Sequence, residues 1–304
     1  MKESNLSGTL RRILQDTKAE IDEDRSCQSL KRLRQMVRHA LPVRSFYAAL
    51  AEGRAVIAEV KEKSPSQGPM LPHNVINSID AYRDSKLVKA VSVLTSRSNF
   101  GKNMTVEWMQ AIKGRVGKPV LRKDFIFDTY QVYQARAYGA DAILLMANIL
   151  TSEELVQLSD LAFELGMDVL FETHCPEELK ELPPSAKIIG INCRTFKGGI
   201  GLNNFKLARF LKQWLWTKND HSVNASRFDY IGQLPSDTIK VAESGVSPET
   251  CEEVFAKGFH SILVGTSLLM DKRGVHAALE DFESRLLPRS KMRKATARLE
   301  PVPA

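Results

Sequence analysis

A lysine stands where a short apolar run of the sequence ends. Residues Pro119 to Leu121 are apolar and lead into Arg122, Lys123 and Asp124. Such a run behind a proline indicates a buried parallel strand, and ligands bind at the carboxyl ends of parallel strands. A lysine paired there with carboxylates could transfer protons. The same three charges could instead begin a solvated loop, so the other strand ends decide between these interpretations.

Several other apolar runs end in charged or amide side chains. Glu59 and Lys61 are two residues apart, which directs both to the same face of a strand. Burying such groups is costly unless they are paired or functional, so a purely structural salt-bridge network is the alternative. A packing network is expected nearer the middle of the strands, and the positions therefore favour a shared active site. The residues predicted to converge there are Glu59, Lys61, Lys123, Glu172, Asn192, Arg194 and Glu243.

Glycines follow the last two apolar runs. Ser244 and Gly245 come after one run, and Gly265 and Thr266 come after the next. Glycine lets backbone N–H groups approach an anion, and this is where barrel enzymes commonly bind phosphate. Each glycine alone could simply mark a tight turn, but the pair predicts a phosphate site.

Short apolar runs alternate with amphipathic segments from residue 55 onward. Eight strand and helix units predict a closed (β/α)₈ TIM barrel. A doubly wound open sheet is the alternative, but no Gly-x-Gly-x-x-Gly follows the first run. The eight runs are Ala55 to Val60, Ala90 to Leu94, Pro119 to Leu121, Asp141 to Met146, Asp168 to Phe171, Ile188 to Ile191, Thr238 to Ala242 and Ser261 to Val264.

Three segments are predicted around this repeat. Residues 1–50 form an N-terminal helical extension with two apolar stripes, and we assign no site residue to them; the barrel spans 51–287. Residues 288–304 form a basic tail that we expect to be disordered. The polar stretch Lys218 to Ser226 is predicted to be a loop inserted at the lower rim of the barrel, opposite the strand ends.

Composition limits the classes of function. The chain is 43% hydrophobic with a net charge of +7, and no apolar run approaches the roughly 18 residues of a membrane span. The beginning of the sequence lacks a secretory signal pattern, so a cytoplasmic location and free thiols are expected. The sequence contains no C-x-x-C pair, the spacing that would suggest a zinc or redox site. We expect the basic charge to attract a small anionic substrate, with no nucleic acid or membrane partner.

Six segments, in order, resemble the indole-3-glycerol phosphate synthase family of tryptophan biosynthesis. The resemblance runs from about the first helix to Leu287. The segments are Ile57 to Ser66, Pro119 to Phe125, Gly139 to Asp141 with Leu144 and Leu145, Gly190 to Arg194, Val241 to Gly245, and Val264 to Leu268.

This resemblance implies a reaction. The substrate would be 1-(2-carboxyphenylamino)-1-deoxyribulose 5-phosphate, and the products indole-3-glycerol phosphate, carbon dioxide and water, with no cofactor or metal. The chain would be a carboxy-lyase, present as a monomer or weak homo-oligomer.

The resemblance also implies residue roles. Lys123 would be the general acid of ring closure, Glu172 an acid/base of the dehydration, and Lys61 an aid to proton transfer. Glu59 would join this catalytic group while orienting the substrate. Substrate-binding roles are implied for Asn192, Arg194, Glu243, Ser244 and Ser64, with Pro65, Phe100, Phe125 and Leu144 walling the anthranilate ring, and phosphate-binding roles for Lys61, Gly245, Gly265 and Thr266.

Two loops depart from the family pattern. Ser96 stands where an acid is usual after the second run, and Thr195 with Phe196 replaces Asp-Leu. These changes leave open a paralogue on the same barrel that acts on a different aryl-amino sugar phosphate. A non-catalytic binding barrel is the third possibility, and retention of Lys61, Lys123 and Glu172 argues against it.

Overall fold

The computed structural model describes residues 1–2, 7–64, 67–196, 221–223 and 225–287. Pro65 and the predicted basic tail, 288–304, lie outside these ranges. None of the described helices is both long and apolar enough to cross a membrane.

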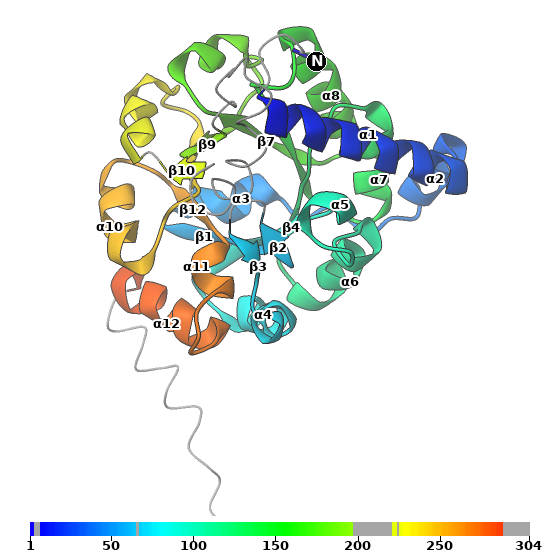
Figure 1. Cartoon of the computed structure of the whole chain (residues 1–304). Helices are drawn as coiled ribbons and strands as arrows, with labels where there is room; N and C mark the ends of the chain where they lie inside the picture. The colour runs from blue at the N-terminus through cyan, green and yellow to red at the C-terminus, as the bar shows by residue number, and fades with distance from the viewer. Residues whose placement is uncertain (3–6, 65–66, 197–220, 224, 288–304) are drawn as a thin grey trace, which may run out of the picture.

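Eight parallel strands close into a barrel, which confirms the predicted fold (Figure 1). Around the barrel the order is β1, β12, β11, β8, β7, β6, β5 and β4, and β4 pairs again with β1. The strands are β1 (Ala55–Val60), β4 (Val88–Leu94), β5 (Val120–Lys123), β6 (Ala142–Met146), β7 (Asp168–Thr173), β8 (Ile188–Asn192), β11 (Ile239–Glu243) and β12 (Ser261–Val264).

Helices follow most strands and form the outer ring seen in Figure 1. They bury the outward faces of the strands, so β1, β6, β8 and β12 are buried at every position. The helices are α4 (Pro72–Asp84), α5 (Arg97–Phe100), α6 (Val106–Val116), α7 (Thr129–Ala137), α8 (Ser152–Glu164), α10 (Pro248–Ala256), α11 (Thr266–Leu269) and α12 (Val275–Leu286), with 3₁₀ helices η2 (Pro176–Glu181) and η3 (Ala225–Gln233).

Several strands extend one or two residues beyond the apolar runs seen in the sequence, and these added residues include charged and amide side chains. Lys123, Asn192 and Glu243 are the last residues of β5, β8 and β11, and Glu172 is the penultimate residue of β7. The register places Glu243 beside Asn192. Because these side chains stand on the sheet itself, their positions are set by the barrel and not by the loops.

Three helices precede the barrel: α1 (Gly8–Cys27), α2 (Leu30–Val37) and α3 (Phe46–Ala51). The predicted apolar stripe of α1 is buried against the barrel. Its Glu20 accepts a hydrogen bond of 2.7 Å from the backbone N–H of Ser98, and Asp24 accepts one of 3.0 Å from Arg97. Helix α1 therefore fixes the loop that follows β4.

The insertion after β8 differs from the prediction. His221–Val223 form a strand, β10, that pairs antiparallel with β9 (Arg194–Phe196), which directly follows β8. This part lies at the carboxyl end of the barrel, so its predicted place at the lower rim is wrong. The pairing satisfies backbone groups that β9 would otherwise leave open. A second short hairpin, β2 (Lys63–Ser64) with β3 (Gly68–Pro69), follows β1.

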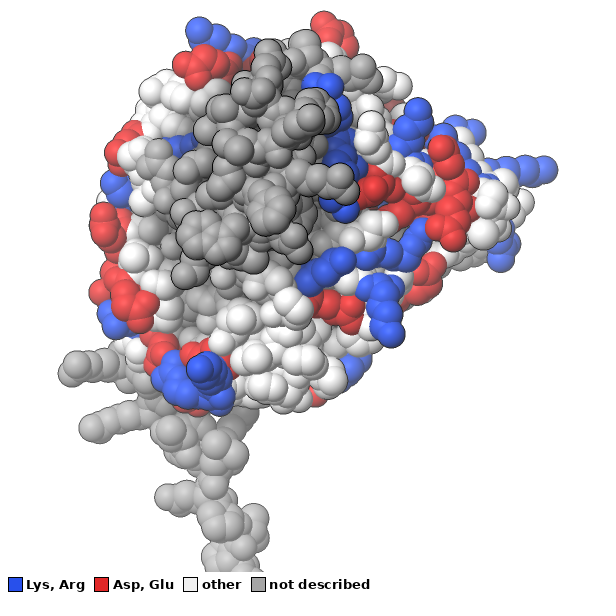
Figure 2. Space-filling model, viewed as in Figure 1, with Lys and Arg blue, Asp and Glu red and all other residues white. Residues whose placement is uncertain are grey.

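Basic and acidic side chains alternate on the described surface of the face seen in Figure 2. Among the described ion pairs near the surface, Arg273 pairs with Asp271 and Asp281, each at 2.6 Å. Exposed pairs of this kind contribute little stability. The ion pair of Lys113 and Asp141 differs from these pairs because both of its side chains are buried.

Asp141, just before β6, anchors the amino-terminal end of the barrel. Its carboxylate accepts hydrogen bonds from the backbone N–H groups of Arg44 at 2.6 Å and Val120 at 2.7 Å. It also pairs with Lys113 of α6, and both side chains are buried. One carboxylate thus joins the extension, a helix and two strands.

We expect Asp141→Asn to lower the free energy of unfolding by about 3–5 kcal/mol, because it leaves the Lys113 ammonium buried without its counter-charge. Urea denaturation measures the loss. Asp160→Asn, at an exposed position of α8, is the control and should change stability by less than about 0.5 kcal/mol. Equal losses in the two variants would contradict this role of Asp141.

Candidate active site

A cavity of about 490 Å³ opens at the carboxyl ends of the strands. Its volume lies within the roughly 300–1,000 Å³ of small-molecule sites. Pro65 is outside the described residues, and the structure brings every other predicted site residue to the cavity wall. These are Glu59, Lys61, Ser64, Phe100, Lys123, Phe125, Leu144, Glu172, Asn192, Arg194, Glu243, Ser244, Gly245, Gly265 and Thr266.

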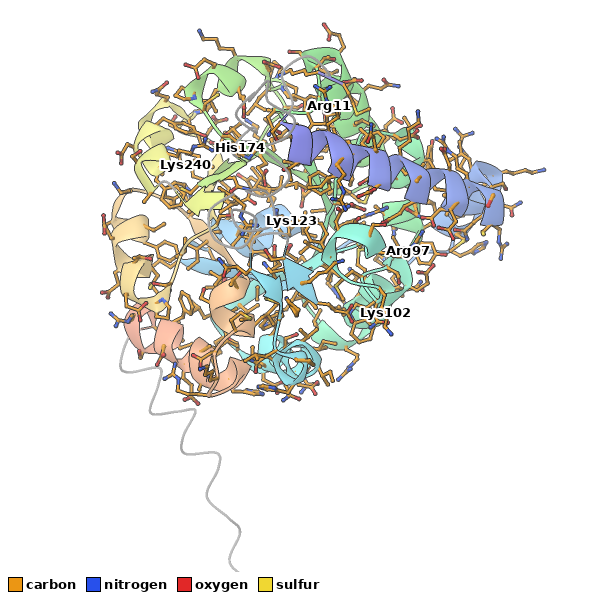
Figure 3. All side chains as sticks on the ribbon, in the orientation of Figure 1. Arg11, Arg97, Lys102, Lys123, His174 and Lys240 are labelled. Carbon is orange, nitrogen blue, oxygen red and sulfur yellow. The ribbon has the colours of Figure 1, made fainter. Side chains whose placement is uncertain are left out.

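Lys123 lies inside the ring of helices, whereas the exposed Lys102 lies toward the edge of the molecule (Figure 3). The Nζ atom of Lys123 is 3.4 Å from Glu172 Oε2 and 3.6 Å from Glu243 Oε2. The Lys123 side chain is only 17% exposed, which rules out the interpretation as a solvated loop residue.

The two charged neighbours of Lys123 in the sequence pair with each other. Arg122 Nη2 donates to Asp124 Oδ2 at 3.0 Å, and Thr95 Oγ1 donates to the same oxygen at 2.7 Å. Arg122 also donates to the carbonyl oxygen of Gln131 in α7 at 2.9 Å. This buried cluster fixes the backbone on both sides of Lys123.

Electrostatics separate the roles of the two carboxyl groups next to Lys123. Burial alone would lower the pKa of Lys123, but Glu172, Glu243 and Glu59 raise it above 10.5. Burial would raise the pKa of Glu172, yet Lys123 and His174 hold it below 4.5. Burial and the Glu172 carboxylate raise the pKa of Glu243 well above 4.5. The site therefore favours the ammonium form of Lys123 and the carboxylate form of Glu172, and it shifts Glu243 toward its neutral form.

A glycine makes room for Glu243. A Cβ atom at Gly190 would lie 2.1 Å from Glu243 Oε1, so any other residue there would force the Glu243 carboxyl group to move. Gly265 makes room for Glu59 in the same way, because a Cβ atom added at Gly265 would lie 2.4 Å from Glu59 Oε1. Predicted only as a phosphate-loop residue, Gly265 thus also shapes the acid–base cluster.

Glu59 and Lys61 form a second buried ion pair in the cavity. Burial would raise the pKa of Glu59, but Lys61 and Lys123 lower it. Burial lowers the pKa of Lys61 below 10.5, although Glu59 opposes this effect. Tyr82 of α4 donates a hydrogen bond of 3.1 Å to the Glu59 carbonyl oxygen and steadies this strand end.

One side of the cavity is apolar. The rings of Phe100 and Phe125 are nearly parallel, with an interplanar angle of 7° and centroids 6.1 Å apart. Leu144 and Ile13 line the same cavity. Such a surface suits an aromatic ring.

The opposite side is made of the loops after β11 and β12. Ser244 and Gly245 both have positive φ, 69° and 72°. A positive φ is uncommon for serine, and such backbone strain concentrates at functional sites. The Ser267 hydroxyl donates to the Val246 carbonyl oxygen at 2.9 Å, which ties the two loops together.

Sequence reasoning missed several cavity residues. Ile13 comes from α1, where no site residue was assigned, and its apolar stripe gave no sign that one member would reach the cavity. Four residues directly adjoin predicted residues and could have been found from that adjacency: Asp124, Val246, Val264 and Ser267. The other missed wall residues are Gln67, Leu94, Met146, Ser247, Leu263, Met270 and Asp271.

The raised pKa of Glu243 makes a prediction about stability. A carboxyl group with a raised folded-state pKa contributes stability below its unfolded value, and that contribution is lost as pH rises through the folded pKa. Glutamine keeps the neutral form at every pH. Glu243→Gln should therefore gain stability relative to the wild type between pH 5 and pH 8, measured by urea denaturation. Parallel stability curves for the two proteins would show that Glu243 is not perturbed in this way.

Comparison with known proteins agrees with this geometry. A model of the family "Indole-3-glycerol phosphate synthase" matches residues 10–209. The indole-3-glycerol phosphate synthase of Paenarthrobacter aurescens is 36% identical over 85% of this chain and 90% of its own length. That of Lachnospira eligens is 38% identical over 74% of this chain and 78% of its own.

Solved structures show the same fold at low sequence identity. The 3-hexulose-6-phosphate synthase of Salmonella typhimurium is 15% identical, covers 77% of this chain and 98% of its own, and superposes with a TM-score of 0.55. That likeness concerns the barrel alone. The family match and the identities to curated relatives show that this chain belongs to the indole-3-glycerol phosphate synthase family.

Proposed function

We propose that the cavity closes the indole ring of 1-(2-carboxyphenylamino)-1-deoxyribulose 5-phosphate, releasing carbon dioxide and water to give indole-3-glycerol phosphate. The observation that carries the proposal is the Lys123 ammonium, held 3.4 Å from Glu172 in a cavity with an apolar wall. Membership of the family supports the reaction and its place in tryptophan biosynthesis. The residue roles below are part of the proposal.

Ring closure needs a proton donor at the ribulose C2 carbonyl oxygen. The aromatic carbon that bears the carboxylate attacks C2, and Lys123 Nζ gives a proton to the oxygen as its negative charge develops. The raised pKa of Lys123 supports this role because the group enters the reaction protonated. Loss of carbon dioxide then returns the C–C electron pair to the ring and restores its aromaticity.

Dehydration needs a base and an acid on the same intermediate. Glu172, ionised in the free enzyme, takes a proton from the methylene carbon C1. The C2 hydroxyl leaves as water with a proton that Lys61 or Lys123 supplies, and a C1–C2 double bond forms. The presence of both ion pairs in one cavity supports this assignment, because their groups could reach a single substrate.

Binding at both ends of the substrate would hold C2 near the ring. We assign the anthranilate ring to the wall of Phe100, Phe125 and Leu144, and the phosphate to the loops of Gly245, Gly265 and Thr266 with Lys61. Such orientation can lower the barrier by about 7–11 kcal/mol when the reacting atoms are well aligned. Arg194, Asn192 and Ser244 then contact the ribulose between these ends.

We expect Lys123→Ala to reduce kcat by about 10²–10⁴-fold, the usual contribution of a general acid. A fluorescence assay for the indole product measures the loss, and thermal unfolding tests whether the variant is still folded. Lys102→Ala, at an exposed position, is the matched control and should keep full activity.

Two results would contradict the proposal. Undetectable turnover by folded wild-type protein would reject the reaction itself. Full activity of folded Lys123→Ala would reject the role of the lysine while leaving the reaction standing.

A further inference from the structure

A buried histidine stands behind Glu172. His174 follows β7 and is two residues beyond Glu172, and Figure 3 shows it within the ring of helices. Its side chain is 9% exposed, and it is not among the residues that line the cavity. Any effect of His174 on the substrate therefore passes through another residue.

The two ring nitrogens of His174 face two different carboxylates. Nε2 is 3.4 Å from Glu172 Oε1, and Nδ1 is 3.7 Å from Glu178 Oε2. Glu178, in η2, also accepts a hydrogen bond of 2.7 Å from the His174 backbone N–H. The side chains thus form a row of carboxylate, imidazole and carboxylate that leads away from the cavity.

Three buried polar atoms in this row have no hydrogen-bond partner among the described residues. Among the described residues, neither ring nitrogen of His174 has a hydrogen bond, and neither does Glu172 Oε1. Buried polar atoms without partners are rare, because each costs about 1–3 kcal/mol. A histidine kept only for packing would be expected to satisfy its nitrogens or to be replaced by an apolar side chain.

The two oxygens of Glu172 consequently face different groups. Oε2 faces Lys123 in the cavity, and Oε1 faces His174 behind it. Contacts at 3.4 Å are longer than a well-formed hydrogen bond, and contacts between catalytic groups are often long before the substrate binds.

We propose that His174, anchored by Glu178, is a positioning residue for Glu172: its Nε2 holds Oε1 so that Oε2 stays directed at Lys123 and the substrate. This inference rests on the proposed reaction and goes beyond it by naming what orients the base. A misplacement of about 1 Å at a reacting group can cost on the order of 100-fold in rate.

Two variants of similar volume separate positioning from packing. His174→Leu keeps the bulk but has no nitrogen, and we expect kcat to fall by about 10–100-fold with KM nearly unchanged. His174→Gln keeps an N–H donor that can reach Glu172, and it should retain kcat within about threefold of the wild type. His260→Leu, a histidine that contacts the Lys240 backbone N–H away from the cavity, is the control and should not change kcat.

A double variant tests whether the effect passes through Glu172. Once Glu172 is glutamine, adding His174→Leu should lower kcat no further, because residues that act as a unit are not additive. Independent losses in the double variant, or a His174→Leu protein as active as wild type, would overturn the proposal. An inactive, folded His174→Gln together with an active His174→Leu would do the same.

A spectroscopic measurement keeps this inference separate from the reaction. At fixed neutral pH, Glu172→Gln should move the ¹⁵N resonances of the His174 ring, assigned by comparison with His174→Gln. Resonances that do not move would overturn the contact even if the wild type is active. If the wild type does not turn over the substrate, the proposed reaction is rejected. The change in the His174 ¹⁵N resonances then decides by itself whether His174 contacts Glu172.

Discussion

The ammonium group of Lys123 is the charge around which the site is built. Removed from water at the end of β5, it is stable only because carboxyl groups from other strands approach it, Glu172 at 3.4 Å and Glu243 at 3.6 Å. One ammonium cannot neutralise two buried carboxylates. The two carboxyl groups therefore differ: the pKa of Glu172 is lowered and the pKa of Glu243 is raised. The ammonium and the carboxylate that we propose as acid and base follow from this one constraint.

Backbone geometry makes this crowding possible. Gly190 leaves room for Glu243 and Gly265 leaves room for Glu59, so two carboxyl groups reach the interior without displacing a strand. The register of the barrel then brings Glu243 beside Asn192. The ion pair of Asp141 and Lys113 secures the opposite end of the barrel, where a barrel's stability residues are expected. The charges proposed for catalysis and the ion pair of Asp141 and Lys113 thus lie at opposite ends of the barrel.

The barrel and most of the cavity wall could be predicted because strand ends of a parallel sheet converge, and the sequence places acids, lysines and glycines at those ends. Three features could not be predicted from the sequence. Ile13 reaches the cavity through the path of α1, which local periodicity does not determine. The pairing of His221–Val223 with β9 is a long-range contact with no local signal. The raised pKa of Glu243 depends on its burial and on how closely Glu172 approaches, and spacing along the chain fixes neither.

The state of Lys123 in the free enzyme tests this account most directly. Lysine side-chain NMR, with the resonance assigned by Lys123→Gln, follows its Nζ through a pH titration. The account predicts an ammonium group that persists beyond the ordinary lysine value of 10.5. A neutral amine at pH 8 would contradict it, because Lys123 could then neither balance Glu172 nor donate the proton of ring closure.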